Sequence, residues 1–126
     1  MSRVIILGST GLFLLGCSGL FGPTYPSVAY THWERKGDDR LRFTSDSSCI
    51  LDWNNMAGSP VEGTYYEDGD MIYVELEPSD NISTLKMEFR RTGKCSAARI
   101  RGYSEEKGWW ESSSIWEQSE PRCIDL

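Results

Sequence analysis

From residue 28 onward, apolar and polar side chains alternate with a period of two along several short runs. In DMIYVELE, for example, Ile72, Val74 and Leu76 alternate with polar residues such as Glu75 and Glu77. Successive residues of a β-strand point to opposite faces of a sheet, so this pattern predicts strands with one buried face. No long stretch of this region shows the 3.6-residue period of an amphipathic α-helix. The alternation therefore predicts an all-β fold.

Turn residues separate these runs at regular intervals, and the Asp68-Gly69 pair is a strong hairpin signal. The pattern predicts seven or eight short antiparallel strands, at about residues 28–34, 39–45, 49–54, 61–67, 71–77, 83–91, 95–103 and 109–116. Such a series is typical of a small barrel or sandwich. We favour a barrel, because a meander that closes on itself has no exposed edge strand.

The alternation also predicts which side chains point inward. The expected interior residues are bulky: Leu41, Phe43, Leu51, Trp53, Ile72, Leu85 and Phe89. Bulky side chains favour a filled core over a ligand cavity. In AARIRGY, the same rule assigns Ala98 and Ile100 to the inner face and Arg99 and Arg101 to the outer face.

The first residues have a different character, with an uncharged apolar stretch from Val4 to Gly16 that follows Arg3. As a helix, these residues would rise about 20 Å, which is too short for a hydrocarbon core of about 30 Å. The stretch contains three glycines, which weaken a permanent helix. A positive charge, a short apolar region and small residues are typical of a cleaved signal peptide.

Leu14-Leu15-Gly16-Cys17 resembles the lipobox of bacterial lipoproteins. This resemblance implies that residues 1–16 are removed and that Cys17 carries lipid. An ordinary secretory signal and a retained anchor are the alternatives. Ser18, where an Asp would retain an enteric lipoprotein in the inner membrane, is similar to the outer-membrane pattern. Two or more acyl chains would hold the protein durably.

Residues 17–27, rich in Gly, Pro and Ser, are expected to form a flexible tether that joins the lipid to one β-barrel domain at 28–126. The alternative for residues 18–27 is an ordered N-terminal arm.

A second resemblance concerns the strands themselves. LRF, followed by a turn and by GTYYEDGDMIYVEL, is similar to the order of strands and turns in small lipocalin-like bacterial lipoproteins. It covers about 40 residues and includes no motif that carries chemistry. It implies a barrel, and it leaves a carrier of a small apolar ligand as one hypothesis.

Three cysteines follow Cys17: Cys49, Cys95 and Cys123. An oxidising envelope permits one disulfide among them, and the sequence leaves both Cys49–Cys95 and Cys95–Cys123 open. Their wide spacing and the single histidine, His32, do not match a metal site. We therefore expect neither a metal nor a cofactor.

Charge limits the classes of partner. The whole chain has a formal net charge of −6, which becomes −7 once Arg3 leaves with the signal, and this argues against binding to nucleic acid. Residues 61–80 hold seven acids and no Lys or Arg, including Glu67, Asp68 and Asp70. They could face a cationic protein, or they could pair with the bases of the next hairpin.

Tryptophans supply the other candidate surface. Trp109, Trp110 and Trp116 cluster near the end of the chain, either as a binding surface or as part of the core. Among Tyr65, Tyr66 and Tyr73, the alternation predicts a mixture of inward and outward rings.

His32 has no recognisable nucleophile motif nearby, and PRCIDL gives Cys123 no visible catalytic environment. We therefore expect a protein that is not an enzyme. The sequence predicts a lipid-anchored envelope protein that acts as a binding or accessory module toward another protein, for example as an inhibitor. A carrier of a small apolar ligand is the alternative function.

Overall fold

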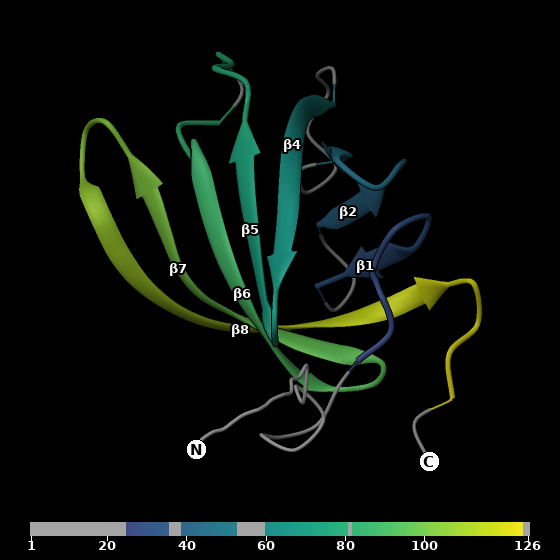
Figure 1. The fold of residues 1–126 in the computed structure, drawn as a ribbon. Helices are drawn as coiled ribbons and strands as arrows, with labels where there is room; N and C mark the ends of the chain where they lie inside the picture. The colour runs from purple at the N-terminus through teal and green to yellow at the C-terminus, as the bar shows by residue number, and fades with distance from the viewer. Residues whose placement is uncertain (1–24, 36–38, 53–59, 81, 125–126) are drawn as a thin grey trace, which may run out of the picture.

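The computed structural model describes residues 25–35, 39–52, 60–80 and 82–124. These residues form eight antiparallel strands and no helix (Figure 1). The strands are β1 (His32–Glu34), β2 (Arg40–Phe43), β3 (Ser48–Asp52), β4 (Val61–Asp68), β5 (Met71–Leu76), β6 (Lys86–Gly93), β7 (Ser96–Ser104) and β8 (Gly108–Glu120). Each strand pairs with the next along the chain, and β8 pairs with β1 to close a barrel. The predicted all-β barrel is confirmed, and the sandwich alternative is wrong.

The strand bounds differ from the prediction mainly at the two ends of the barrel. β1 is shorter than predicted, because Val28 accepts a hydrogen bond from the backbone N–H of Thr31 and the chain turns there. β8 is longer than predicted and continues to Glu120, where it pairs with β1. Closure of the barrel therefore depends on residues 117–120, which are polar and do not show the alternation of apolar and polar side chains.

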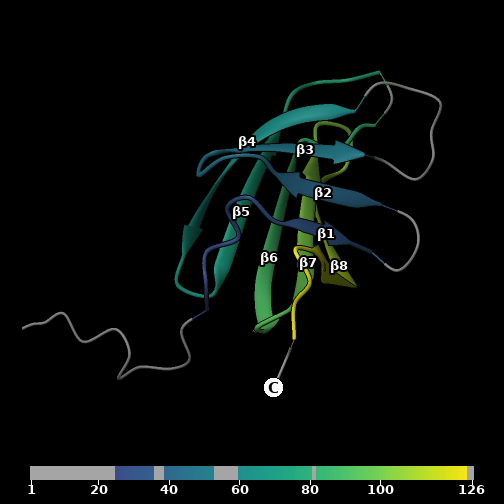
Figure 2. The ribbon, with the colours of Figure 1, turned by 90° about the vertical axis from the view of Figure 1, so that its right-hand side faces the viewer.

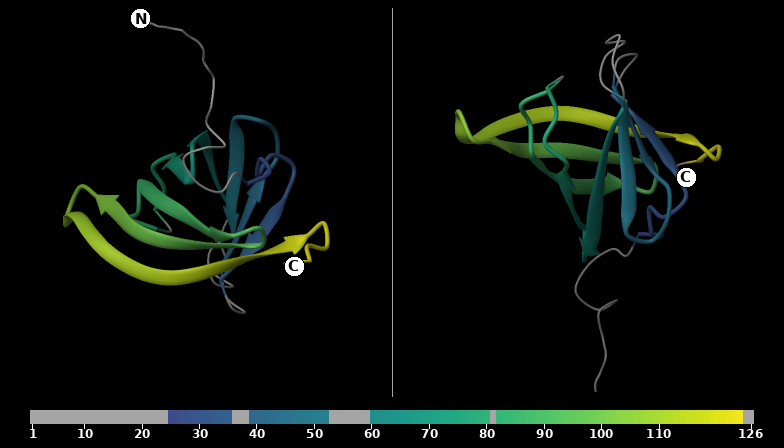
Figure 3. Two further views of the ribbon diagram at one scale, coloured as in Figure 1. Left: turned by 60° about the horizontal axis from the view of Figure 1, so that its bottom comes forward. Right: turned by 90° about the horizontal axis from the view of Figure 1, so that it is seen from above.

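β8 pairs with its two neighbouring strands over unequal lengths. Residues 108–117 pair with β7, whereas only 117–120 pair with β1. The start of β8 and the end of β7 therefore form a hairpin that reaches away from the other strands (Figure 3). Figure 2 shows the opposite side, where β1, β2 and β3 lie next to one another.

The interior is packed with large side chains. Trp116 meets Phe89 edge to face at 5.4 Å, and Phe43 meets Tyr65 at 4.6 Å. The cavity that Phe43, Phe89 and Trp116 line together with their neighbours is only about 10 Å³. Five of the predicted interior residues are buried: Leu41, Phe43, Leu51, Ile72 and Phe89. Leu85 is only half-buried, and Trp53 lies outside the described residues.

The prediction for β7 is wrong over three residues. Arg99 points inward and is 9% exposed, whereas Ala98 and Ile100 are only half-buried. The pairing of β7 shifts between Arg99 and Arg101, which is the mark of a β-bulge. A bulge adds one residue to a strand and reverses the alternation beyond it. Arg101 faces outward as predicted, but Arg99 donates a hydrogen bond to Ser112 Oγ inside the barrel at 3.1 Å.

One disulfide fastens the C-terminal segment to the β6–β7 turn. It joins Cys95 to Cys123, with the two Cα atoms 5.8 Å apart, and this decides between the two pairings that the sequence left open. Cys49 is a buried free thiol on β3. Burial raises its pKa from 9.0 to about 12.

The segment before β1 is held against the same end of the barrel. The buried guanidinium of Arg91 lies between the rings of Tyr25 and Trp33 and donates a hydrogen bond to the carbonyl of Pro26 at 2.8 Å. Burial lowers the pKa of Arg91, although the nearby Glu67 carboxylate raises it in part. Tyr25, Pro26 and Ser27 therefore contact Arg91 and Glu67 of the barrel, whereas the tether over residues 17–27 stays a prediction. Residues 17–24 lie outside the described residues.

The part of the chain that the structure describes contains no helix both long and apolar enough to span a bilayer.

Candidate functional site

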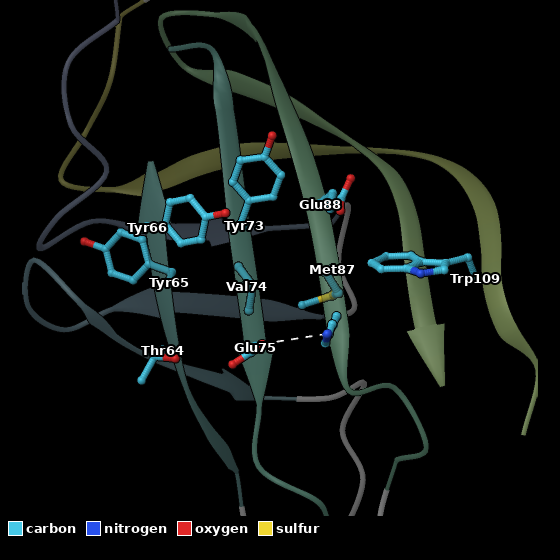
Figure 4. Close-up of a pocket in the computed structure, with 10 residues that line it drawn as sticks. Thr64, Tyr65, Tyr66, Tyr73, Val74, Glu75, Met87, Glu88 and Trp109 are labelled. Atoms are coloured by element: carbon cyan, nitrogen blue, oxygen red, sulfur yellow. Dashed lines mark ion pairs between the residues drawn. The ribbon is translucent and has the colours of Figure 1, made fainter. Parts of the chain in front are cut away.

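A groove of about 260 Å³ lies on the outer face of β4, β5 and β6 (Figure 4). Tyr66 and Tyr73 lie at one side, and Trp109 reaches over from β8 at the other. Glu75 of β5 and Lys86 of β6 also line the groove. The groove is open to solvent, so a partner can reach it without any movement of the barrel.

Strand register brings these side chains together. One row of outward residues runs across the sheet through Tyr66, Tyr73, Glu88 and Arg101. Directly opposed residues of paired strands share a face and touch.

The next outward row, on the same face, contains Glu75, Lys86, Tyr103 and Trp109. Five consecutive strands thus place aromatic rings near both ends of the face and charged groups in its middle.

Two tyrosines form the first wall. Their rings stack with centroids 4.8 Å apart and planes 24° apart. Tyr66 is nevertheless 61% exposed. Tyr73 is half-buried beneath it. A stacked pair of this kind presents a broad apolar surface whose hydroxyl groups can still hydrogen-bond.

Trp109 forms the second wall and is held in place by β7. Its ring packs at 5.2 Å from the ring of Tyr103, and the guanidinium of Arg101 lies 4.1 Å from its centroid. Contact between a guanidinium and an indole is attractive, so Arg101 fixes the orientation of Trp109. The indole is still 44% exposed. It is an apolar surface that is already ordered before any partner arrives.

The charged groups of the groove pair with one another. Arg101 donates to Glu88 at 2.8 Å, and Lys86 lies 3.8 Å from Glu75. The side-chain hydrogen bond to Glu88 is the main reason that the pKa of Arg101 is raised. The two carboxylates and two cations of these pairs balance one another between the aromatic walls.

The three tryptophans of the sequence analysis separate onto different surfaces. Trp109 belongs to the outer groove, whereas Trp110 lies on the inner face against Gly102. A Cβ at Gly102 would lie 2.8 Å from Cζ2 of Trp110, so only glycine leaves room for the indole. Trp116 is 1% exposed and belongs to the core, so the expectation that it lines a binding surface is wrong.

The acidic residues proposed for a cationic partner lie elsewhere, around the β4–β5 turn. Glu67 accepts hydrogen bonds from Ser27 Oγ at 2.6 Å and from the backbone N–H of Val28. Asp70 lies 3.7 Å from Arg90 of the neighbouring hairpin. Asp68 is exposed. Pairing between hairpins, the alternative to an acidic face, therefore accounts for Asp70.

The catalytic candidates lie apart from the groove. His32 is on β1 at the seam with β8, with Nδ1 3.4 Å from the carboxylate of Glu120. Cys123 is in the disulfide. Within the described ranges, no three His, Cys, Asp or Glu side chains gather as a metal site would require.

Sequence reasoning missed Tyr103, Arg101, Glu88 and Lys86 as members of one face. A signal existed for the Tyr66–Tyr73 pair, because a two-residue turn at Gly69-Asp70 places them directly opposite each other. The remaining members required the registers of β6, β7 and β8, which depend on the bulge in β7. Comparison with protein-family models, with curated proteins and with solved structures finds no match for this chain.

Proposed function

We propose that this chain is a lipid-anchored protein of the cell envelope that acts without catalysis, as a module that docks another protein. The observation that carries the proposal is the ordered, exposed aromatic groove between Tyr66, Tyr73 and Trp109. Tyrosine and tryptophan are enriched at binding hot spots, because their rings give much contact area at little cost in entropy. The resemblance of Leu14–Cys17 to a lipobox supports anchoring through Cys17, on the periplasmic side of the outer membrane.

The geometry supports docking in the groove better than carriage of a ligand inside the barrel. The apolar space enclosed near Trp33 and Trp116 is about 10 Å³. Ligand sites usually measure hundreds of cubic ångströms, so this part of the interior has no room for an apolar ligand. The groove is far larger and is open.

Docking is tested by placing a photo-crosslinking amino acid at residue 66 of the full chain in its native cells. We expect a covalent adduct of defined mass that disappears when Trp109 is also changed to alanine. Tyr30 is 70% exposed and lies outside the groove, so crosslinker at that position is the matched control. Equal adducts at positions 66 and 30, or none at position 66, would contradict docking in the groove.

Anchoring has its own test. A Cys17→Ala variant should move from the membrane fraction to the soluble fraction, because the thiol that accepts lipid is gone. Retention of the variant in the membrane fraction would count against the lipobox.

A further inference from the structure

The two aromatic walls of the groove define its width. Tyr73 is on β5 and Trp109 is on β8, three strand positions away, which corresponds to about 14 Å at ~4.8 Å per strand. The indole of Trp109 leans over β7 onto Tyr103 and Arg101, so the open width is nearer two strand positions, or about 10 Å. Figure 4 shows β6 crossing between the two walls. This width accommodates a single extended chain.

The charge of the groove excludes strongly ionic occupants. Glu88 is held by Arg101, and Glu75 is paired with Lys86, so neither an acidic nor a basic partner meets an unbalanced charge. Burying either pair beneath an ionic ligand would cost desolvation without a compensating attraction. The occupant that fits best is uncharged and apolar, with hydrogen-bond acceptors.

We propose that the groove binds an uncharged, proline-rich segment of a partner protein in the polyproline II conformation. This inference rests on the proposed function and specifies the partner. Proline-rich segments dock in aromatic-lined grooves, and their preformed helix loses little entropy on binding. Residues on one side of this helix repeat every three positions at ~3.1 Å per residue, so prolines recur about every 9 Å. A helix that lies along β6 between the two walls therefore presents prolines at this interval to the rings on either side.

Hydrogen-bonding groups of the walls support the same occupant. The phenol groups of Tyr66 and Tyr73 and the indole N–H of Trp109 are donors at the ends of apolar rings. A polyproline helix has unpaired backbone carbonyls that accept such bonds. A glycan would stack on the same rings, but its hydroxyl groups need several polar partners, and the carboxylates here are already paired. The paired charges therefore favour the peptide.

The test measures binding of acetylated, amidated octaproline to the full chain in phospholipid nanodiscs by calorimetry. We expect saturable binding that weakens about tenfold or more in the separate variants Trp109→Ala and Tyr73→Ala. Trp109→Phe should recover part of the affinity because it restores an aromatic face. Tyr30→Ala, an exposed ring outside the groove, should bind as the unaltered chain does. A glycine-serine octapeptide should not bind.

Three results would overturn the inference: no binding of octaproline, equal binding of octaproline and the glycine-serine peptide, or binding unaffected by Trp109→Ala. Binding of cellohexaose that depends on Trp109, without binding of octaproline, would assign the groove to a glycan instead. If octaproline fails while the crosslink at residue 66 still depends on Trp109, the partner class is wrong but protein docking stands. Variants that keep the Cys95–Cys123 bond and unfold like the unaltered chain are accepted as folded.

Discussion

The inner and outer faces of the β4–β8 sheet both carry clustered aromatic rings, but the surroundings of the rings differ. On the inner face, Trp116 meets Phe89 within a core that the other strands close over. On the outer face, Tyr66 stacks on Tyr73 in view of solvent. Rings of the first kind contribute mainly to stability, whereas rings of the second kind are available to a partner. Trp109 and Trp110 are adjacent in β8 and therefore point to opposite faces of the sheet, which decides the role of each.

The largest expected effect separates the two faces directly. Trp116→Ala should lower the free energy of unfolding by about 3–5 kcal/mol, because it removes a fully buried indole and leaves a cavity. Trp109→Ala should lower it by less than about 1 kcal/mol, because the exposed indole loses few contacts. Urea unfolding of both variants measures the difference. Similar losses in the two variants would mean that the outer aromatic face is also part of the folding core.

The second-largest loss of stability should come from removal of the disulfide, which ties the C-terminal segment to the β6–β7 turn. Changing both Cys95 and Cys123 to serine releases a loop with a sequence separation of 28 residues. Loops of this size contribute about 2–4 kcal/mol through the restricted unfolded chain. Urea unfolding of the oxidised chain and of the double variant tests this. An unchanged midpoint would show that the hydrogen bonds of the β1–β8 seam suffice for closure.

A smaller effect should come from the inner side of the projecting hairpin. Gly102→Ala places a methyl group 2.8 Å from Trp110 Cζ2, and overpacking of this kind costs about 1–3 kcal/mol. Because the clash involves one side chain, Gly102→Ala should cost less in a Trp110→Ala background. Thermal unfolding of the two single variants and the double variant gives this coupling. Additive effects would place the strain in the backbone of β7 instead.

The last expected effect is absent at neutral pH and is an alkaline loss of stability from the buried side of β3. Cys49 titrates near pH 12 in the folded chain and near 9.0 when exposed, so the folded state keeps a proton that the unfolded state loses between those values. Stability should therefore be unaffected below pH 9 and should fall as the pH rises from 9 to 12.

The fall should be shallower in Cys49→Ala, as measured by urea unfolding at pH 8 and pH 11. Parallel falls in the two chains would assign the effect to other groups. Tyr65 is one such group, because burial raises its pKa to about 12.

Much of this barrel could be predicted from local pattern. The strand runs, the hairpin of β4 and β5 and five of the interior residues follow from alternation and turn chemistry, which act within a few residues, although the turn occupies Gly69-Asp70 and not Asp68-Gly69. Closure by β8 could not be predicted in the same way, because residues 117–120 are polar and gain their strand structure from pairing with β1. The inward orientation of Arg99 could not be predicted either, because a bulge reverses which residues point inward without any change in amino-acid composition.

Prediction of the groove would have required the pairing of residues still farther apart in the sequence. Tyr66 and Tyr73 meet within one hairpin, but Trp109 joins them across three further strand pairings. Each pairing shifts by whole residues, and a shift of one would place Trp109 in the core and Trp110 outside. The sequence marks these rings as candidates, but only the accumulated register decides which of them form a surface.

The attachment of both terminal segments to the β6–β7 turn also sets how the protein carries mechanical load. Arg91 bonds to the carbonyls of Pro26 and Lys94, and Cys95 next to Lys94 is bonded to Cys123. A force on the N-terminal side is therefore transmitted through the bonds of Pro26 to Arg91 and of Ser27 and Val28 to Glu67. These bonds precede the three-residue strand β1 in the chain. We expect the tension to pass first to β6, which carries Arg91, and to β4, which carries Glu67. The short seam between β1 and β8 should then be protected from separation by a pull on this side.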